Sequence, residues 1–263
     1  MKQKHLLDLT VKCVERINEK YILIKLTDNA PLPDMAPGQF VEIRVDGSKT
    51  TFLRRPISIH YVDYEKNELW LLVALVGDGT RALAKLKEGD MLNILLPLGN
   101  GFTVAPDCEE NAKKDYSVLL VGGGVGVAPL LYAGEMIRKN GGTPIFLLGA
   151  RSKSDLLELD NFRAIGEVFI TTEDGSEGEK GFVTNHSVWN THNFSQISVC
   201  GPKPMMVAVA KLAREKGVYC EVSLENKMAC GVGACLCCVE DTQDGNVCVC
   251  KDGPVFSIDK LKW

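Results

Sequence analysis

The chain has 263 residues and a formal net charge of −4, with 45% hydrophobic and 24% charged residues. This length and composition predict a packed protein of two domains rather than a disordered chain. The acidic balance argues against a general nucleic-acid binder, because neutralising phosphates requires clustered lysine and arginine. No apolar run approaches the length of a membrane span, and the first ten residues lack a signal-peptide core, so we expect a cytoplasmic protein.

Residues 1–104 are predicted to be rich in β-strands. Turn-forming segments separate six short runs rich in Val, Ile and Leu, a pattern that favours a six-stranded antiparallel barrel. The runs are LDLTVKCVERI, YILIKLT, QFVEIRV, RRPISIHYV, ELWLLVALV and MLNILLPL. A helical stretch, TRALAKLKEGD, precedes the last run, and Gly89 is expected to end that helix.

The segment from Ala105 to Tyr116 is polar and breaks this pattern, so we place a domain boundary there. Over residues 115–224, apolar strands alternate with helices, which predicts a parallel sheet covered by helices. The last of these helices runs from Pro204 to Lys216 and is expected to end at Gly217. From Glu225 onward the chain fits neither pattern, and we expect loop.

Ten cysteines need an explanation in a chain that is expected to stay in a reducing compartment. Six of them fall within the last 34 residues, at Cys230, Cys235, Cys237, Cys238, Cys248 and Cys250. Such local crowding indicates a metal site rather than a disulfide scaffold, which would spread its cysteines along the chain.

The spacing of these cysteines is typical of a plant-type [2Fe–2S] cluster. The pattern C-x4-C-x2-C is formed by Cys230, Cys235 and Cys238, and further cysteines follow. Gly231 and Gly233 allow the tight path that points backbone N–H groups at sulfurs. Zinc is the alternative, although zinc ligands usually form short knuckles across a longer gap. Spacing leaves Cys248 and Cys250 as competing fourth ligands, and the two spare cysteines are expected to be packing or incidental thiols.

A glycine-rich turn lies between an apolar strand and a helix that is expected to begin near Pro129. Its glycines are Gly122, Gly123, Gly124 and Gly126. Free N–H groups and a helix N-terminus at such a turn favour binding of a dinucleotide pyrophosphate, although glycines also serve plain strand-to-helix packing. No acidic residue ends the next strand, which runs instead into Arg151 and Ser152.

Two further segments of the first domain are candidates for phosphate binding. In the run RRPIS, Arg55 is a fork-shaped donor suited to a phosphate, and Ser58 is suited to contact a ring system. A charged edge strand is the alternative, since proline is tolerated there. The turn Gly77–Thr80, just before the short helix, also has phosphate-accepting geometry.

The order of these motifs resembles that of the ferredoxin–NADP reductase superfamily. The shared elements are the R-P-x-S strand, G-x-G-T, PLGNGF, VGGGVGVAPL and CGPKPMM. The tail, ENKMACGVGAC followed by VCKDGPVF, resembles that of the electron-transfer subunit of the NAD-linked, two-subunit dihydroorotate dehydrogenase. The resemblance covers essentially the whole chain, and the tail is its most specific part.

The resemblance implies three segments, with an FAD-binding barrel in 1–104, an NAD-binding α/β domain in 115–224 and a [2Fe–2S] segment in 225–263. It implies FAD contacts from Arg55, Pro56, Ile57, Ser58, Leu72, Val73, Ala74, Gly79 and Thr80. The nicotinamide side would be formed by Gly122, Gly123, Gly124, Gly126, Cys200 and Gly201. The family's last ligand precedes the acidic-Gly-Pro-Val-Phe stretch, so the implied cluster ligands are Cys230, Cys235, Cys238 and Cys250.

The function implied by the resemblance is electron transfer between NAD and a partner subunit. NADH would reduce FAD, and single electrons would pass to the cluster, or the reverse. No side chain is needed as a nucleophile or general base. In the family, a separate subunit oxidises dihydroorotate at FMN in pyrimidine (UMP) synthesis, and the usual assembly holds two copies of each subunit.

Three points stay open from the sequence. NADH is expected over NADPH, although Arg151 and Ser152 are also suited to hold a 2′-phosphate. A subunit of another redox complex, such as a sulfide dehydrogenase or hydrogenase, is the first alternative function. A non-catalytic zinc or iron–sulfur sensor module is the second.

Overall fold

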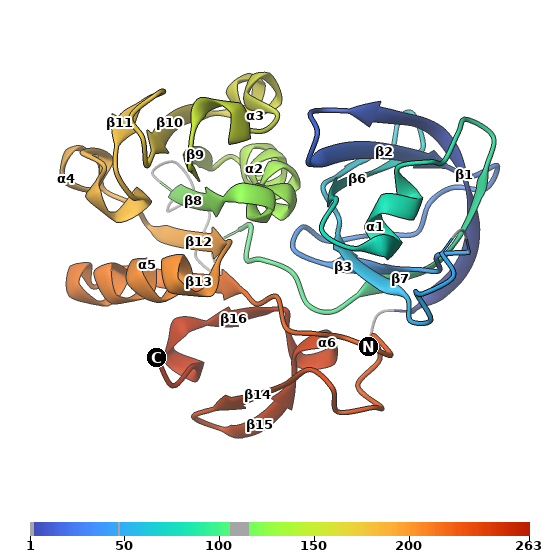
Figure 1. Ribbon diagram of the computed structural model, residues 1–263. Coiled ribbons are helices and arrows are strands. Elements are labelled where there is room, and N and C mark those ends of the chain that lie inside the picture. Colours follow the sequence, from blue (N-terminus) through green and yellow to red (C-terminus); the bar gives the residue numbers. More distant parts are fainter. Residues whose placement is uncertain (1–2, 47, 106–115) are drawn as a thin grey trace. The chain divides into compact units, whose positions relative to one another are not determined.

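The computed structural model of the chain describes residues 3–46, 48–105 and 116–263. They form two compact units, each built from more than one stretch of chain. The barrel unit comprises residues 1–101, 226–241 and 246–254, and the sheet unit comprises 102–225, 242–245 and 255–263. The stretch beyond residue 225, drawn orange to red in Figure 1, is therefore divided between the two. The boundary segment expected around residues 105–116 lies almost entirely outside the described residues.

The strands of the barrel unit are antiparallel, as expected of the predicted six-stranded barrel, and they form a half-barrel. Its strands follow the order β4-β3-β7-β1-β2-β6-β5, and Figure 1 shows them curving around a short helix. They are β1 (His5–Arg16), β2 (Tyr21–Thr27), β3 (Phe40–Ile43), β4 (Arg55–Ser58), β5 (Tyr61–Asp63), β6 (Glu68–Ala74) and β7 (Met91–Leu98). Seven strands arise from six predicted runs because RRPISIHYV is interrupted at Ile59 and His60.

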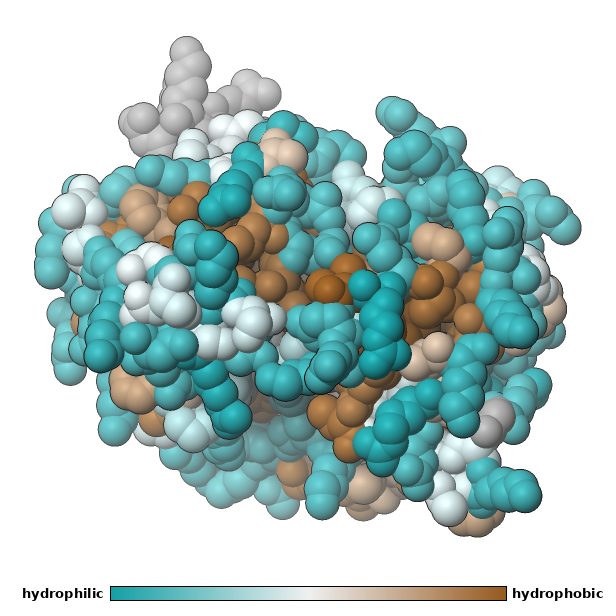
Figure 2. Space-filling model, turned by 45° about the horizontal axis from the view of Figure 1, so that its top comes forward, coloured by the Kyte–Doolittle hydropathy of each residue, from teal (hydrophilic) through white to brown (hydrophobic). Residues whose placement is uncertain are grey.

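Alternating side chains of these strands fill the barrel interior. On β1, Leu9 and Val11 are fully buried while Thr10 and Lys12 are not, as the two-residue period of a strand requires. On β2, Ile24 and Leu26 are likewise fully buried, while Lys25 between them is not. Burying each such side chain stabilises the fold by roughly 1.5–3 kcal/mol. On the face shown in Figure 2, by contrast, hydrophilic residues cover most of the surface.

The helix of the barrel unit, α1 (Asp78–Leu83), is shorter than expected. Its end at Gly89 was a wrong prediction, because the chain leaves the α-helix at Ala84. The following N–H groups then bond to carbonyls three residues back, as from Leu86 to Leu83. Gly89, at φ +89°, instead forms the turn into β7, where its N–H donates to the carbonyl of Val11 at 2.9 Å.

The sheet unit contains the expected parallel sheet. Its order is β11-β10-β9-β8-β12-β13-β16, with only β16 antiparallel to its neighbour. The strands are β8 (Ser117–Gly123), β9 (Thr143–Ala150), β10 (Glu167–Thr172), β11 (Glu179–Lys180), β12 (Gln196–Cys200), β13 (Tyr219–Ser223) and β16 (Val255–Ser257).

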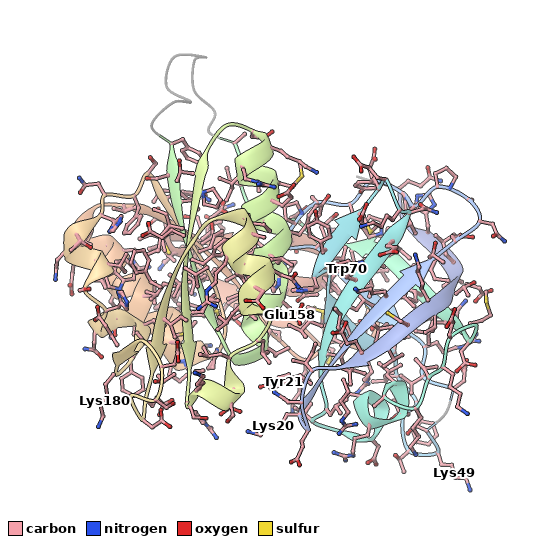
Figure 3. The ribbon with its side chains drawn as sticks, turned by 90° about the horizontal axis from the view of Figure 1, so that it is seen from above. Lys20, Tyr21, Lys49, Trp70, Glu158 and Lys180 are labelled. Carbon is pink, nitrogen blue, oxygen red and sulfur yellow. The ribbon has the colours of Figure 1, made fainter. Side chains whose placement is uncertain are left out.

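Helices cover the faces of this sheet. They are α2 (Ala128–Lys139), α3 (Leu159–Ile165), α4 (Val188–Thr191) and α5 (Lys203–Lys216), with short 3₁₀ turns at Gly124–Val127, Lys153–Asp155, Val183–Asn185 and Ile258–Lys260. Figure 3 shows α2 and α3 along one face. As predicted, α5 ends at Gly217, which takes the left-handed conformation. Within the described ranges, no helix is long and apolar enough to cross a membrane.

The C-terminal stretch is more regular than the loop that was expected. It contains the hairpin β14 (Val239–Thr242) and β15 (Gly245–Cys248), then α6 (Val249–Asp252) and β16. β16 adds to the edge of the parallel sheet, where Val255 pairs with Ser223 and Phe256 with Val222. Elements of three or four residues are too short to show a period in sequence. β14 and β15 pair with each other, and β16 pairs with the distant strand β13.

Candidate functional sites

The cysteine-rich loop brings four thiols together as two pairs. The side chains of Cys230 and Cys235 lie close enough to interact, and so do those of Cys238 and Cys250. The N–H of Cys250 also donates to Sγ of Cys238 at 3.3 Å. Among the described residues, no three or more Cys, His, Asp or Glu converge as for a single metal ion. Two thiol pairs instead suit a cluster with two irons and four cysteine ligands.

Backbone N–H groups of the loop point at these sulfurs. Burial alone would raise the pKa of Cys230, but N–H groups from Val232, Ala234 and Cys235 favour its thiolate and lower the pKa to about 6. The N–H of Val232 lies 3.5 Å from that sulfur. Iron binds cysteine as thiolate, so such donors suit a cluster site.

Positive φ angles allow the loop to take this path. Gly231 and Gly233 have φ of +66° and +83°, and Leu236 has +59°. A Cβ on Gly233 would lie 2.9 Å from Cδ of Lys251, so the position admits no side chain without displacing its neighbour. The role expected for the two glycines is thus met by their conformation.

The two candidates for a fourth ligand differ in their surroundings. Cys250 is 1% exposed and lies in α6, paired with Cys238. Cys248 is half-buried, and its N–H donates a hydrogen bond to the carboxylate of Asp252 at 2.9 Å. The other spare cysteine, Cys237, is exposed. The paired thiols are therefore those of the four cysteines that the family resemblance implies.

The loop is tied to the barrel through Asn100, a residue that the sequence did not single out. Its N–H donates to the carbonyl of Gly253 at 2.6 Å, and its side-chain amide donates to that of Asp252 at 2.9 Å. Gly99, at φ +73°, allows the close approach, because a Cβ there would lie 2.6 Å from the Gly253 oxygen. The Gly-Asn-Gly sequence after β7 is the only local signal of this contact.

Arg55, the first residue of β4, and Arg54, which precedes the strand, have different roles. The guanidinium of Arg54 is used by the barrel itself, donating to the carbonyls of Glu42 and Asn93 at 3.2 and 3.0 Å. Arg55 lies beside the G-x-G-T turn, where a Cβ on Gly79 would be 3.2 Å from its Cδ. The structure thus brings Arg55 and Gly79 together. The remaining residues of β4, Pro56, Ile57 and Ser58, are all half-buried.

The other residues expected at the flavin lie on β6 and α1. β6 packs against β4, but Leu72 and Val73 are buried in the barrel and only Ala74 of the three is part-exposed. The hydroxyl of Thr80 is bonded within the turn, to the N–H and the carbonyl of Gly77, each at 3.1 Å. Thr80 therefore fixes the start of α1, so that any phosphate contact there falls to backbone groups.

Sequence reasoning also missed Glu42, a carboxyl in the barrel wall. It lies on β3 and is fully buried, and neither carboxylate oxygen has a hydrogen-bond partner among the described residues. Burial raises its pKa to about 7, against the attraction of Arg55 and Arg54. No local pattern marks it, because the sequence QFVEIRV places a glutamate where alternation alone suggests an exposed side chain.

In the sheet unit, the glycine turn and the CGPKPM segment meet at the carboxyl ends of adjacent strands. Cys200 on β12 pairs in register with Gly122 on β8. A Cβ on Gly126 would lie 2.5 Å from both the Cys200 carbonyl oxygen and Cα of Gly201, and one on Gly123 would lie 2.6 Å from Sδ of Met205. Strands run outward in both directions from β8 and β12, which makes this the switch point where such sheets bind nucleotides.

The Cys200 thiol at this switch point is not an activated nucleophile. It is 1% exposed, and its pKa is raised mainly by burial and further by the negative charge of the nearby Glu225. A thiol with a raised pKa stays neutral at physiological pH and is a poor nucleophile.

The loop after β9 is occupied by its own polar contacts. The hydroxyl of Ser152 bonds with that of Ser154 at 2.9 Å and with the carboxylate of Asp155 at 3.3 Å. Lys153 forms an ion pair with Glu177 at 3.0 Å. Ser152 and Lys153 of this loop are thus each in contact with a carboxylate, that of Asp155 and that of Glu177.

These features together define a nucleotide-binding oxidoreductase that carries an iron–sulfur segment. A family model for the iron-sulfur cluster binding domain of dihydroorotate dehydrogenase B matches residues 225–262. A model for the oxidoreductase NAD-binding domain matches residues 120–211.

Similar proteins extend the likeness to the whole chain. The dihydroorotate dehydrogenase B (NAD(+)) electron transfer subunits of Shouchella clausii and Fusobacterium nucleatum are 41% and 38% identical to it. These alignments cover 86% and 95% of each chain, respectively. The chain belongs to this family of electron transfer subunits and is an oxidoreductase subunit.

Solved structures also resemble the chain. A chain from the structure of the NADH-dependent reduced ferredoxin–NADP oxidoreductase has a TM-score of 0.84 at 30% identity, covering 100% of this chain and 92% of its own. A ferredoxin NADP+ reductase from Neisseria gonorrhoeae, with bound FAD and NADP, has a TM-score of 0.64 at 19% identity. That alignment covers 81% of this chain and 92% of the reductase, and it supports the fold alone.

Proposed function

We propose that this chain carries electrons between NAD and the FMN of a separate dihydroorotate dehydrogenase catalytic subunit, through its own FAD and [2Fe–2S] cluster. The observation that carries the proposal is the pairing of Cys230 with Cys235 and of Cys238 with Cys250, within the segment matched by the cluster-binding family model. The related chains of Shouchella clausii and Fusobacterium nucleatum are electron transfer subunits of dihydroorotate dehydrogenase B (NAD(+)).

The proposed cluster ligands are the four paired cysteines. N–H groups at Val232 and Gly233, directed at Cys230 and Cys250, would offset the negative charge of thiolates in a part-buried loop. Asn100 would hold the loop against the barrel through the carbonyls of Gly253 and Asp252. Cys248 and Cys237 have no ligand role in this proposal.

The proposed FAD site lies on the barrel unit. Arg55 would hold phosphate oxygens beside Gly79 and Thr80, where the chain approaches without a side chain at Gly79. The ring system would lie along the two strands that pack together, contacted by Pro56, Ile57, Ser58, Leu72, Val73 and Ala74. Buried Leu72 and Val73 would contribute through their backbone.

The proposed NAD site is the switch point of the sheet unit. Its residues are Gly122, Gly123, Gly124, Gly126, Cys200 and Gly201. Glycines at this point leave room for the pyrophosphate against the backbone. The functional division that we propose is 1–104 for FAD, 115–224 for NAD and 225–263 for the cluster.

The protein's contribution to the reaction is positioning and electrostatics. Bound flavin would supply the conversion between a two-electron hydride and single electrons, which a [2Fe–2S] cluster carries one at a time. The residues described above bind and orient these groups, and none is assigned a proton or nucleophile role.

The proposed partner is an FMN-containing catalytic subunit, in an assembly with two copies of each chain. Pyrimidine synthesis would be the pathway, and a reducing cytoplasm would keep the cluster cysteines from forming disulfides. Exposed apolar side chains near the cysteines, Val232, Leu236 and Val239, suit a protein partner rather than solvent.

The experiment is anaerobic purification followed by cofactor analysis. We expect one FAD, two irons and two sulfides per chain, with the absorbance of flavin and of a [2Fe–2S] cluster. Zinc in place of iron and sulfide, or a colourless protein, would contradict the proposal. A non-catalytic sensor module would then explain the cysteine-rich segment better.

A second candidate is an electron-transfer subunit of another redox complex. It is favoured by the 0.84 TM-score to a chain from a structure described for flavin-based electron bifurcation. Co-purification from native cells separates the two, because the bound chain would be either a dihydroorotate-oxidising FMN subunit or a subunit of another complex.

A further inference from the structure

The buried carboxyl of Glu42 lies directly behind the cysteine-rich loop. A Cβ on Gly231 would be 2.8 Å from Cγ of Glu42 and 3.3 Å from its Oε1. Gly231 follows Cys230 in the chain, and its missing side chain leaves the space that the glutamate occupies. Glu42 also pairs across the sheet with Pro56 of β4, so the residue connects the strand proposed for flavin with the loop proposed for the cluster.

This carboxyl has no local partner that would account for its burial. Both oxygens lack hydrogen bonds among the described residues, although the side chain is 0% exposed. The guanidinium of the nearby Arg54 donates its hydrogen bonds to backbone carbonyls and to the side chain of Asn93, and not to the Glu42 carboxylate. Burying an ionisable group without partners is costly, so an orphaned carboxyl at such a place requires an explanation beyond packing.

The charges around Glu42 act on it from two sides. Arg55 and Arg54 attract a carboxylate, whereas the sulfur of Cys230 repels it. Electrostatic coupling is reciprocal, so a carboxylate that is repelled by Cys230 disfavours additional negative charge on that sulfur and on whatever it binds. Reduction of a cluster adds one negative charge, and the low dielectric of a buried site strengthens the effect.

We propose that Glu42 is a positioning residue whose negative charge lowers the reduction potential of the cluster held at Cys230. The inference rests on the proposed function, because it requires a cluster in the loop. It goes beyond that function by assigning control of the potential to a residue of the barrel wall rather than of the loop. The absence of a side chain at Gly231 is what allows the charge to approach so closely.

The test is a redox titration of the full-length chain with its cofactors, followed by electron paramagnetic resonance of the cluster. It is carried out in alkaline buffer, where the carboxyl is ionised. Glu42→Gln keeps the shape and removes the charge, and Glu42→Met removes the charge and any hydrogen-bond donor. Both variants are expected to shift the midpoint potential to more positive values with unchanged iron and FAD content.

Glu68→Gln is the matched control. Glu68 is another buried glutamate of the barrel, 4% exposed, but it is bonded to Lys12 and Trp70. Its removal takes away the same charge from the same unit, and the midpoint potential is expected to stay at the wild-type value.

Each outcome decides the matter. The role of charge is overturned if the midpoint potential of Glu42→Gln equals that of the wild type. It is also overturned if the potential shifts in Glu42→Gln but not in Glu42→Met. If Gln and Met lose the cluster, Glu42→Asp decides. A cluster retained by Asp at the wild-type midpoint potential supports the role of the charge. A cluster retained at a more positive potential, or lost from Asp as well, overturns it. A wild-type chain without any cluster signal contradicts the proposed function itself, which is a separate result.

Discussion

The N–H of Gly233 donates to Sγ of Cys250 at 3.1 Å, joining the turn between the first two cysteines to the last one. Burial raises the pKa of Cys250 to about 12, and its pairing with Cys238 acts in the same direction, while this N–H opposes both. The contact depends on the positive φ of Gly233 and on α6, which holds Cys250 against the loop. Cys250 thus accepts the N–H of Gly233, whereas the thiol of Cys248 donates to the carbonyl of the same residue at 3.9 Å.

Replacing Cys250 by serine should lose or strongly destabilise the cluster, and Cys248→Ser should leave it largely intact. The reason is that Cys250 interacts with the side chain of Cys238 and accepts the N–H of Gly233, whereas the thiol of Cys248 donates to the carbonyl of Gly233 and interacts with Cys238 and Cys230 through charge. Electron paramagnetic resonance of the reduced variants measures the cluster. A signal lost from the Cys248 variant and kept in the Cys250 variant would reverse the ligand assignment.

Gly233→Ala should lower cluster occupancy. Its φ of +83° strains an L-residue, and the added Cβ would meet Lys251 at 2.9 Å, so the N–H bond to Cys250 would be disturbed. Gly245→Ala is the matched control, since Gly245 has φ +99° with no atom within 4 Å of an added Cβ. Both should cost about 1 kcal/mol of unfolding free energy. Only Gly233→Ala should reduce iron per chain, and equal iron loss in both would show that backbone strain alone is responsible.

Arg55→Ala should weaken FAD binding by roughly ten- to a hundredfold, as expected for losing a charge-assisted hydrogen bond of about 1.5–3 kcal/mol. Arg44→Ala serves as the control, because Arg44 is exposed and forms an ion pair with Asp46 at 2.9 Å. FAD content after gel filtration and fluorescence titration of apoprotein measure the difference. An unchanged FAD affinity in Arg55→Ala would remove Arg55 from the site.

NADH should reduce the flavin faster and at lower concentration than NADPH. A 2′-phosphate would meet the carboxylate of Asp155 beside Ser152, and Lys153 is already neutralised by Glu177. Asp155→Asn should reduce the preference for NADH over NADPH, because it removes a negative charge that would repel the 2′-phosphate. Stopped-flow flavin reduction with each nucleotide decides this, and a wild-type preference for NADPH would mean that Arg151 and Ser152 hold the phosphate after all.

Alone, the chain should pass electrons from NADH to artificial acceptors but should not oxidise dihydroorotate. The Cys200 thiol at the proposed NAD site is buried with a raised pKa, and Cys230, whose pKa is lowered to about 6, is a proposed cluster ligand rather than a base facing a substrate. On adding the catalytic subunit, residues 231–238 should gain protection from hydrogen exchange, because Leu236 is 65% exposed and apolar. Unchanged protection, or dihydroorotate-dependent reduction by this chain alone, would disprove this division of labour.

The sequence by itself determined the features that depend on neighbouring residues. Strand runs, the alternation after Tyr116, the glycine turn before α2 and the C-x4-C-x2-C spacing are all local, and so could be predicted. The end of α5 at Gly217 was predicted for the same reason, because a left-handed cap is a property of a single residue.

Tertiary structure decided what depends on residues far apart in the chain. Glu42 behind Gly231, and Asn100 against Gly253, are contacts between a barrel and a loop that no spacing rule connects. β16 forms because a neighbouring strand offers it an edge, and α1 ends early because packing and turn geometry override its helix-forming residues. Pairing and burial of this kind are long-range, so the physical reason for each lies in its partner rather than in its own sequence.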